Sequence, residues 1–229
     1  MDILVIGGTS GIGKSIVDQM AGQGHHVHVA ARNKPGELPE QASFIQLDVL
    51  QDDLNLEGEK LDAVIYCPGS INLKPFDRLK TGDFEEDFRI NVIGAVRMLQ
   101  AAYPLLKKSK NASVVLFSTV AVSQGMPYHT TTAASKAAVE GLARSLAAEW
   151  APKIRVNVIA PSITDTPMAS RILSSEERKQ NSAKRHALNR VGEPVDIAAM
   201  ATFLVSENAS WISGQVFGVD GGMSSLRSL

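Results

Sequence analysis

The chain has 229 residues, of which 44% are hydrophobic and 21% are charged, which is typical of a globular protein with a sizeable core. Its 23 Lys and Arg balance 24 Asp and Glu, so no excess charge attracts nucleic acid or an anionic membrane. No apolar run is long enough to span a bilayer, and we expect no signal peptide, because the first strand is predicted to begin at residue 3. The single cysteine, Cys67, excludes an internal disulfide and a cysteine-based metal site. We therefore expect a cytoplasmic protein with no metal and with neither a nucleic-acid nor a membrane partner.

The N-terminal stretch predicts a strand, a glycine-rich turn and a helix. Residues 3–6 are apolar and rich in β-branched types, as in a buried strand. Gly7, Gly11 and Gly13 follow in the spacing G-x-x-x-G-x-G, and residues 14–23 carry apolar side chains at helical spacing. The N–H groups of the turn and the positive end of the helix dipole would face one point, which suits a pyrophosphate. An ordinary tight turn is the alternative.

The second predicted strand, residues 26–31, ends at Arg32. In a dinucleotide-binding fold this point meets the adenosine ribose, and a site that prefers NAD places a carboxylate there. Here no carboxylate is present to repel a 2′-phosphate, and a guanidinium is available to bind one. The sequence therefore favours NADP over NAD, unless Arg32 is only a solvated residue that follows a strand.

The rest of the chain alternates between strands and helices. Further strands are predicted over residues 44–47, 61–66, 112–117, 154–159 and 215–219, and further helices over 81–108, 130–150 and 194–205. Seven strands alternating with helices predict the α/β class, with one doubly wound parallel sheet in a single domain, residues 1–229. The polar segment at about 163–190 is predicted to be a mobile lid with few anchors.

The 81–108 helix is expected to bury one apolar stripe. The stripe contains Phe84, Phe88, Val92, Val96 and Leu99. Asn91 lies beside this stripe, although asparagine has a low propensity for the interior of a helix. We expect its side chain to bond a specific partner.

The order and spacing of these pieces resemble the short-chain dehydrogenase/reductase family over essentially the whole chain. The matching motifs are the glycine turn, Asp48-Val49, Asn91 in 90–94, Lys136 in 135–139, and the segments 155–161, 190–194 and 219–222. The resemblance implies a Rossmann-type fold, hydride transfer between a nicotinamide cofactor and a small-molecule substrate, and a homo-oligomer, either tetramer or dimer. It implies cofactor contacts from Gly7, Thr9, Ser10, Gly11, Ile12, Gly13, Arg32, Asp48, Val49, Gly69, Asn91, Lys136, Ile163, Thr164 and Thr166. Asp48 could equally cap the next turn.

The sequence departs from the family at its chemical centre. The family's proton-donating tyrosine lies four residues before the lysine, where this chain has Thr132, and a threonine hydroxyl is too weak an acid to copy that role near neutral pH. The family's serine falls on Thr119. His129 and Tyr128, seven and eight residues before Lys136, are alternative proton donors, although either could line the pocket or cap the helix instead. The candidate catalytic residues are Asn91, Thr119, Thr132, Lys136 and His129.

Two functions follow from these residues. The leading one is an NADP(H)-dependent oxidoreductase that acts on a carbonyl or an activated C=C bond. The alternative is a non-catalytic NADP(H)-binding sensor or partner subunit with a degenerate site. Cations of the lid could attract an anionic substrate or could form a solvated helix face: Arg171, Arg178, Lys179, Lys184, Arg185 and Arg190.

Overall fold

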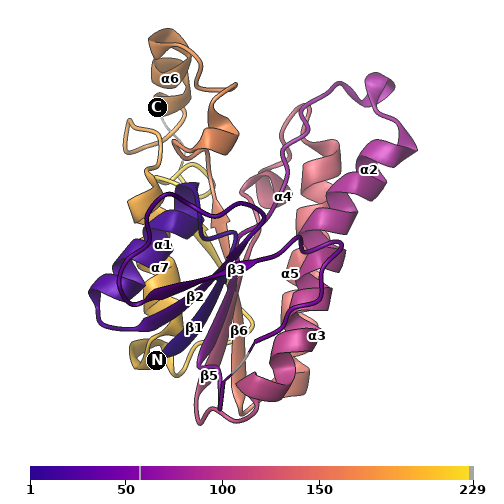
Figure 1. Ribbon diagram of the computed structural model, residues 1–229. Coiled ribbons are helices and arrows are strands. Elements are labelled where there is room, and N and C mark those ends of the chain that lie inside the picture. Colours follow the sequence, from indigo (N-terminus) through magenta and orange to yellow (C-terminus); the bar gives the residue numbers. More distant parts are fainter. Residues whose placement is uncertain (57, 227–229) are drawn as a thin grey trace.

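The computed structural model describes residues 1–56 and 58–226, and it contains one parallel sheet of seven strands in the order β3-β2-β1-β4-β5-β6-β7 (Figure 1). The strands are β1 (Asp2–Ile6), β2 (His26–Ala31), β3 (Ala42–Gln46), β4 (Ala63–Tyr66), β5 (Ala112–Phe117), β6 (Ile154–Pro161) and β7 (Val216–Val219). Each neighbouring pair is parallel. The predicted α/β doubly wound fold is confirmed. Residues 57 and 227–229 of the predicted single domain lie outside the described residues.

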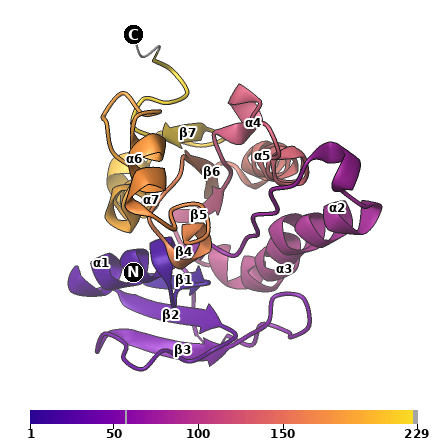
Figure 2. The same ribbon diagram turned by 90° about the horizontal axis from the view of Figure 1, so that it is seen from above.

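Helices cover both faces of the sheet (Figure 2). One face packs against α1 (Gly11–Gly22) and α7 (Pro194–Val205), and the other against α3 (Gly94–Leu106) and α5 (Thr130–Trp150). Successive side chains of a strand point to opposite faces. Leu4 of β1 therefore joins the α3/α5 layer, while Val5 joins the α1/α7 layer. Both layers are buried and apolar, which fixes the register of β1 and the position of the glycine turn that follows it.

The helix predicted over residues 81–108 is interrupted. It consists of α2 (Thr81–Phe88), a π-helical turn at Arg89–Ile93, and α3. The π turn contains one more residue per turn than an α-helix, so the side chains of α2, which precedes it, are rotated about the helix axis. The predicted apolar stripe is therefore wrong at Phe88, whose side chain is 42% exposed, although Val92 and Leu99 are buried as expected. The same turn contains Asn91.

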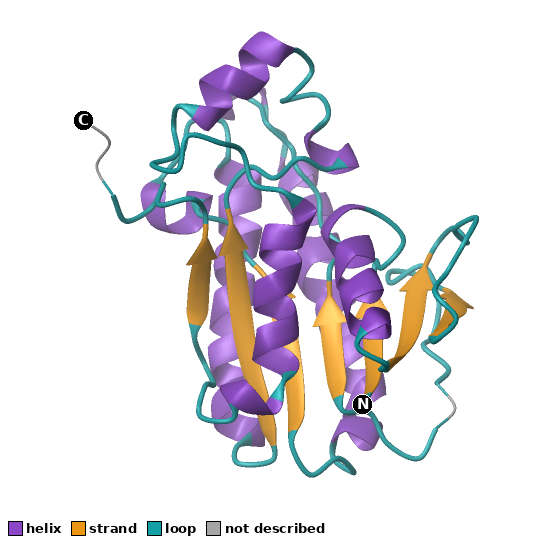
Figure 3. Ribbon diagram, turned by 90° about the vertical axis from the view of Figure 1, so that its left-hand side faces the viewer, coloured by secondary structure: helices purple, strands orange, loops and turns teal. Residues whose placement is uncertain are grey.

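The strands all run toward one end of the molecule, where loops and short helices gather (Figure 3). Between β6 and α7 the chain forms a 3-10 turn (Pro167–Ala169) and α6 (Glu176–Ala183). A further short helix, α4 (Ala121–Gln124), follows β5. Within the described residues, no helix combines the length and the apolar character that crossing a membrane requires.

The predicted lid has more anchors than its sequence indicated. Ala169, Ser182 and His186 are buried. The Nδ1 of His186 pairs with the main-chain carbonyl oxygen of Ser182, and its Nε2 pairs with the hydroxyl of Ser162 at the end of β6, both at 2.8 Å. A buried histidine in a polar run carries no periodic pattern, so this attachment of the lid to the sheet was not predicted.

Candidate active site

A pocket of about 710 Å³ opens at the carboxyl ends of the strands and runs from the glycine turn to Lys136 and the lid. Fourteen of the fifteen predicted cofactor residues line it, and so do Thr119, Thr132 and His129. Asn91 is the exception, because it lies buried behind the pocket wall. This end of a parallel sheet is where α/β proteins bind ligands.

The glycine turn has the shape of an anion cradle. A Cβ on Gly13 would lie 2.3 Å from the carbonyl oxygen of Gly7, so only glycine allows this close approach. Gly7 and Gly11 have positive φ angles of 77° and 52°. The side chain of Ser10, at the N-cap of α1, makes no capping bond, which leaves the first N–H groups of the helix available to an anion. These residues fit a dinucleotide pyrophosphate.

Arg32 and Asp48 lie on the same side of the pocket, beyond β2 and β3. Arg32 is exposed. Asp48 caps its own turn, because its Oδ1 accepts from the N–H of Leu50 at 2.9 Å. Asp48 can therefore cap the turn and also contact a cofactor, since it lines the pocket.

Lys136 lies on α5, buried at the inner end of the pocket. Its Nζ donates to the main-chain carbonyl oxygen of Phe117 at 3.0 Å. Burial lowers the pKa of Lys136 to about 8, although the nearby Cys67 and Asp87 oppose this shift. Burial also raises the pKa of the Cys67 thiol to about 12, against the influence of Lys136. Lys136 can therefore exchange a proton near neutral pH, whereas Cys67 stays a neutral thiol.

Asn91 anchors a polar cluster behind Lys136. Its Nδ2 lies 2.8 Å from the carbonyl oxygen of Asp87, 3.1 Å from Ser70 Oγ and 3.3 Å from Ser135 Oγ. Its Oδ1 is buried without a partner. A Cβ on Gly69 would lie 3.1 Å from that oxygen and 3.3 Å from Lys136 Nζ. The expected specific partner of Asn91 is thus this cluster, with the side-chain oxygen directed toward Gly69 and the lysine.

Two threonine residues, Thr119 and Thr132, line the pocket near Lys136. Thr132 lies one turn before Lys136 on α5, and its buried Oγ1 has no hydrogen-bond partner among the described residues. Among the described residues, Thr119 Oγ1 has one partner, the N–H of Ala121 at 3.3 Å, from which it accepts, so its own proton is available. The adjacent Ser118 is occupied, since its hydroxyl donates to Glu140 at 2.7 Å. Of these hydroxyls, that of Thr119 is available to a bound molecule, that of Ser118 is not, and that of Thr132 is buried beside the pocket without a partner among the described residues.

His129 is the N-cap residue of α5, half-buried at the pocket wall. Its Nδ1 lies 2.7 Å from the carbonyl oxygen of Pro127. That contact orients the ring, and Nε2 has no partner among the residues that the structure describes. Tyr128 has a positive φ of 67°, is 58% exposed and does not line the pocket. Of the two alternative donors, only His129 faces the site.

Two further polar residues of the site, Ser70 and Asp87, were not predicted from the sequence. Ser70, in the loop after β4, lines the pocket and donates to Asp87 Oδ1 at 2.5 Å. Asp87 is buried on α2, and its Oδ2 has no partner among the described residues. Their positions in the sequence could have indicated them, because Ser70 follows Gly69 directly and Asp87 lies four residues before Asn91.

Comparison with known proteins identifies the family. The family model described as enoyl-(acyl carrier protein) reductase matches residues 7–224. A chloroplastic tropinone reductase homolog of Arabidopsis thaliana is 34% identical over 244 residues, which cover 98% of this chain and 76% of that protein. The chain belongs to the short-chain dehydrogenase/reductase family.

Solved structures agree with this membership. A short-chain dehydrogenase/reductase family protein superposes with a TM-score of 0.88 at 28% identity, over 99% of this chain and 98% of the other. ElxO with NADP bound gives a TM-score of 0.87 at 26% identity, over 98% and 99% of the two chains. Membership in this short-chain family makes NAD(P)-dependent oxidoreduction the general function of the protein.

Proposed function

We propose that the protein is an NADPH-dependent reductase of a carbonyl or an activated C=C bond. The observation that carries this proposal is the meeting, in one pocket, of the glycine cradle, the Lys136 ammonium and Thr132, whose hydroxyl has no partner among the described residues. Oxidation of NADPH by the purified protein with a panel of ketones, aldehydes and enoyl thioesters tests it.

The cofactor preference rests on Arg32. Its exposed guanidinium lies on the pocket wall beyond β2, and no carboxylate follows that strand directly. A 2′-phosphate pairs well with such a group. ElxO, the structural neighbour with NADP bound, supports the same choice. Gly7, Gly11 and Gly13 would hold the pyrophosphate, and Lys136 the hydroxyls of the nicotinamide ribose.

The bound nicotinamide supplies or accepts a hydride, and the residues of this chain handle the remaining charge and proton. Thr119 and Thr132 donate hydrogen bonds to the substrate oxygen on which negative charge develops. Lys136 stabilises that charge and, with a pKa of about 8, can release a proton to the site near neutral pH. Asn91 Oδ1 offers an acceptor on the lysine side of Gly69.

Among possible reactions, reduction of an activated C=C bond best suits a site with Thr132 in place of tyrosine. A thioester enolate formed by hydride addition at the β-carbon needs hydrogen bonds to its oxygen, and water can protonate its α-carbon. An alkoxide formed from a ketone needs a stronger acid at the same place. The name of the matching family, enoyl-(acyl carrier protein) reductase, points the same way.

The charges of the lid give limited support for an anionic substrate. Lys179 pairs with Asp165 and Arg190 with Asp196, each at 2.6 Å. These two cations are therefore largely neutralised. Arg185 alone among the lid cations lines the pocket, so it is the residue we propose to meet an anionic or polar group of the substrate.

A non-catalytic NADPH-binding sensor or partner subunit is the second candidate. Thr132 favours it, because a buried hydroxyl cannot replace a phenol as an acid. NADPH oxidation in the presence of a substrate distinguishes the two candidates, because only the reductase carries it out.

We also propose that the protein forms a homo-oligomer through its two long helices. An outward groove between α3 and α5 is lined by apolar side chains that include Tyr103, Leu142, Leu146 and Trp150. Exposed apolar grooves of this kind favour association. Sedimentation velocity at micromolar concentration tests this proposal, and a monomer alone would contradict it.

A further inference from the structure

Three metal-ligating side chains meet at the amino ends of β1 and β2, the end of the sheet opposite the pocket. Asp2 pairs with His26 in the parallel register, and His28 lies two residues further along β2. Residues that pair across strands, or that lie two apart along one strand, share a face of the sheet. Asp2, His26 and His28 therefore project on the same face.

The distances among these side chains suit a common ligand. Asp2 Oδ1 lies 3.3 Å from His26 Nδ1. The rings of His26 and His28 meet edge to face, with centroids 4.4 Å apart. One ligand atom from each of the three residues lies within 4.8 Å of the other two.

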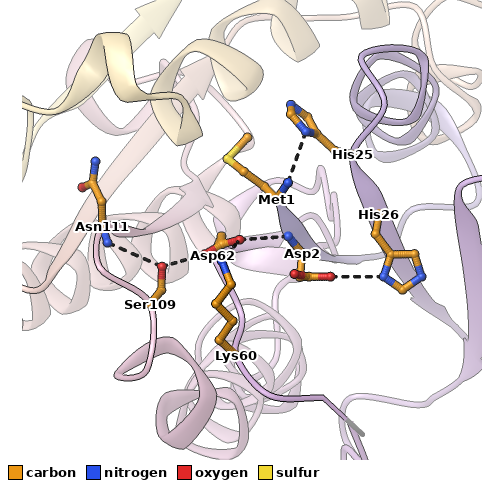
Figure 4. Close-up of polar contacts among 8 residues, drawn as sticks. All are labelled: Met1, Asp2, His25, His26, Lys60, Asp62, Ser109 and Asn111. Carbon is orange, nitrogen blue, oxygen red and sulfur yellow. Dashed lines mark hydrogen bonds and ion pairs between the residues drawn. The ribbon is translucent and has the colours of Figure 1, made fainter.

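The surrounding contacts hold Asp2 in place (Figure 4). Its main-chain N–H donates to Asp62 Oδ2 at 3.0 Å, while its carboxylate points toward His26 (Figure 4). Lys60 donates to both oxygens of Asp62, at 2.8 and 2.9 Å. The nearby ammonium is thus directed to Asp62 and not to the carboxylate of Asp2.

His28 has an outer partner of its own. Its Nδ1 lies 3.0 Å from the hydroxyl of Ser43, and Ser43 pairs with His28 in the register of β2 and β3. Metal-binding histidines are commonly oriented by such a second contact.

We propose that Asp2, His26 and His28 bind a divalent transition-metal ion, with Zn²⁺ the ion that fits best. Two imidazoles and a carboxylate form a donor set that zinc prefers, with a position left for water. Bonds of about 2.0–2.2 Å place tetrahedral ligand atoms about 3.3–3.5 Å apart. Asp2 and His26 already have this separation. A ligand atom of His28 lies within 4.8 Å of both, so ion binding requires this side chain to move closer to them.

The bound ion would link β1 to β2 directly. These strands carry the glycine turn and Arg32 at their other ends. The ion is therefore expected to stabilise the fold without taking part in the reaction. This inference is independent of the proposed reductase activity.

Titration of the full chain with ZnCl₂ tests the proposal, using protein that carries no polyhistidine tag. We expect one equivalent to bind with a Kd of about 10 µM or tighter at pH 7.5. Asp2→Asn, His26→Gln and His28→Gln should each weaken binding at least about tenfold. His25→Gln is the matched control, because the neighbouring His25 ring contacts the Met1 amino group instead (Figure 4), and it should bind as the wild type does.

A second measurement needs no variant. Carbethoxylation of wild-type histidines, read by mass spectrometry, should be slowed by Zn²⁺ at His26 and His28 but not at His25. The absence of saturable binding below about 100 µM would overturn the proposal, and so would equal protection of all three histidines. In either case the Asp2–His26 contact is only a surface hydrogen bond.

Discussion

The ammonium nitrogen of Lys136 lies 3.0 Å from the main-chain carbonyl oxygen of Phe117, which joins α5 to the carboxyl end of β5. The contact holds a buried cation at the end of the pocket, where its charge is costly. Replacing Lys136 by methionine removes that cost and keeps most of the side-chain volume. We therefore expect Lys136→Met to lose turnover while remaining at least as stable as the wild type at pH 7.

The pH dependence of this difference follows from the lowered pKa of Lys136. Between its folded pKa of about 8 and its usual value of 10.5, the unfolded chain binds a proton that the folded chain does not. The destabilising contribution is therefore fully present below about pH 8 and is relieved as the pH rises toward 10.5. Urea unfolding at pH 7 and pH 9.5 should show the variant's advantage, about 1–3 kcal/mol at pH 7, becoming smaller. A variant clearly less stable than wild type at pH 7 would contradict this.

Replacing Thr132 by valine removes its hydroxyl and tests two effects of that group separately, one on the free energy of unfolding and one on kcat. The buried Oγ1 has no partner among the described residues, so Thr132→Val should raise stability by about 1 kcal/mol. If the hydroxyl stabilises developing charge, kcat should fall at least about tenfold. Thr132→Ser is the control, since it keeps the hydroxyl and should keep most of the activity. Turnover by Thr132→Val at the wild-type rate would exclude Thr132 from the reaction.

Gly13 provides a steric test of the cofactor cradle. Gly13→Ala places a Cβ against the carbonyl oxygen of Gly7, 2.3 Å away, and should cost about 1–3 kcal/mol of stability and abolish NADPH binding. Gly22→Ala, at the other end of α1, meets nothing within 4 Å and should stabilise by about 0.4–1 kcal/mol. Thermal unfolding and fluorescence titration with NADPH measure both effects. Tight NADPH binding by Gly13→Ala would contradict the assignment of the cradle.

Arg32 sets the expected preference between the two cofactors. Arg32→Ala should weaken NADPH binding about 10- to 100-fold through loss of a charge-assisted pair. Binding of NADH, which has no 2′-phosphate, should stay within about twofold and serves as the internal control. Wild-type protein that binds NADH more tightly than NADPH would contradict the role proposed for Arg32.

Much of the fold could be predicted because its signals are local. The strands 26–31 and 112–117 and the helices 130–150 and 194–205 coincide with β2, β5, α5 and α7, since apolar runs, turn residues and proline mark their ends. The π turn around Asn91 could not be predicted, because it has the same composition as an α-helix. Its effect on the exposure of Phe88 was missed for that reason.

The site could be predicted where a strand end or a helical turn brings residues together. Lys136 and Thr132 share a helix, and the glycine turn follows β1 directly. The contact of Ser70 with Asp87 and that of Ser162 with His186 join residues 17 and 24 positions apart. These pairs come together only in the folded chain, so their spacing in the sequence does not predict the contacts.

The measurement that tests the central claim most directly is NADPH oxidation by the wild type and by Lys136→Ala, with ketones, aldehydes and enoyl thioesters as substrates. Our account predicts turnover by the wild type, strongest with an enoyl thioester, and none by the variant. Wild-type protein that binds NADPH at micromolar concentration but oxidises it with no substrate class would contradict the reductase and favour the sensor or partner subunit.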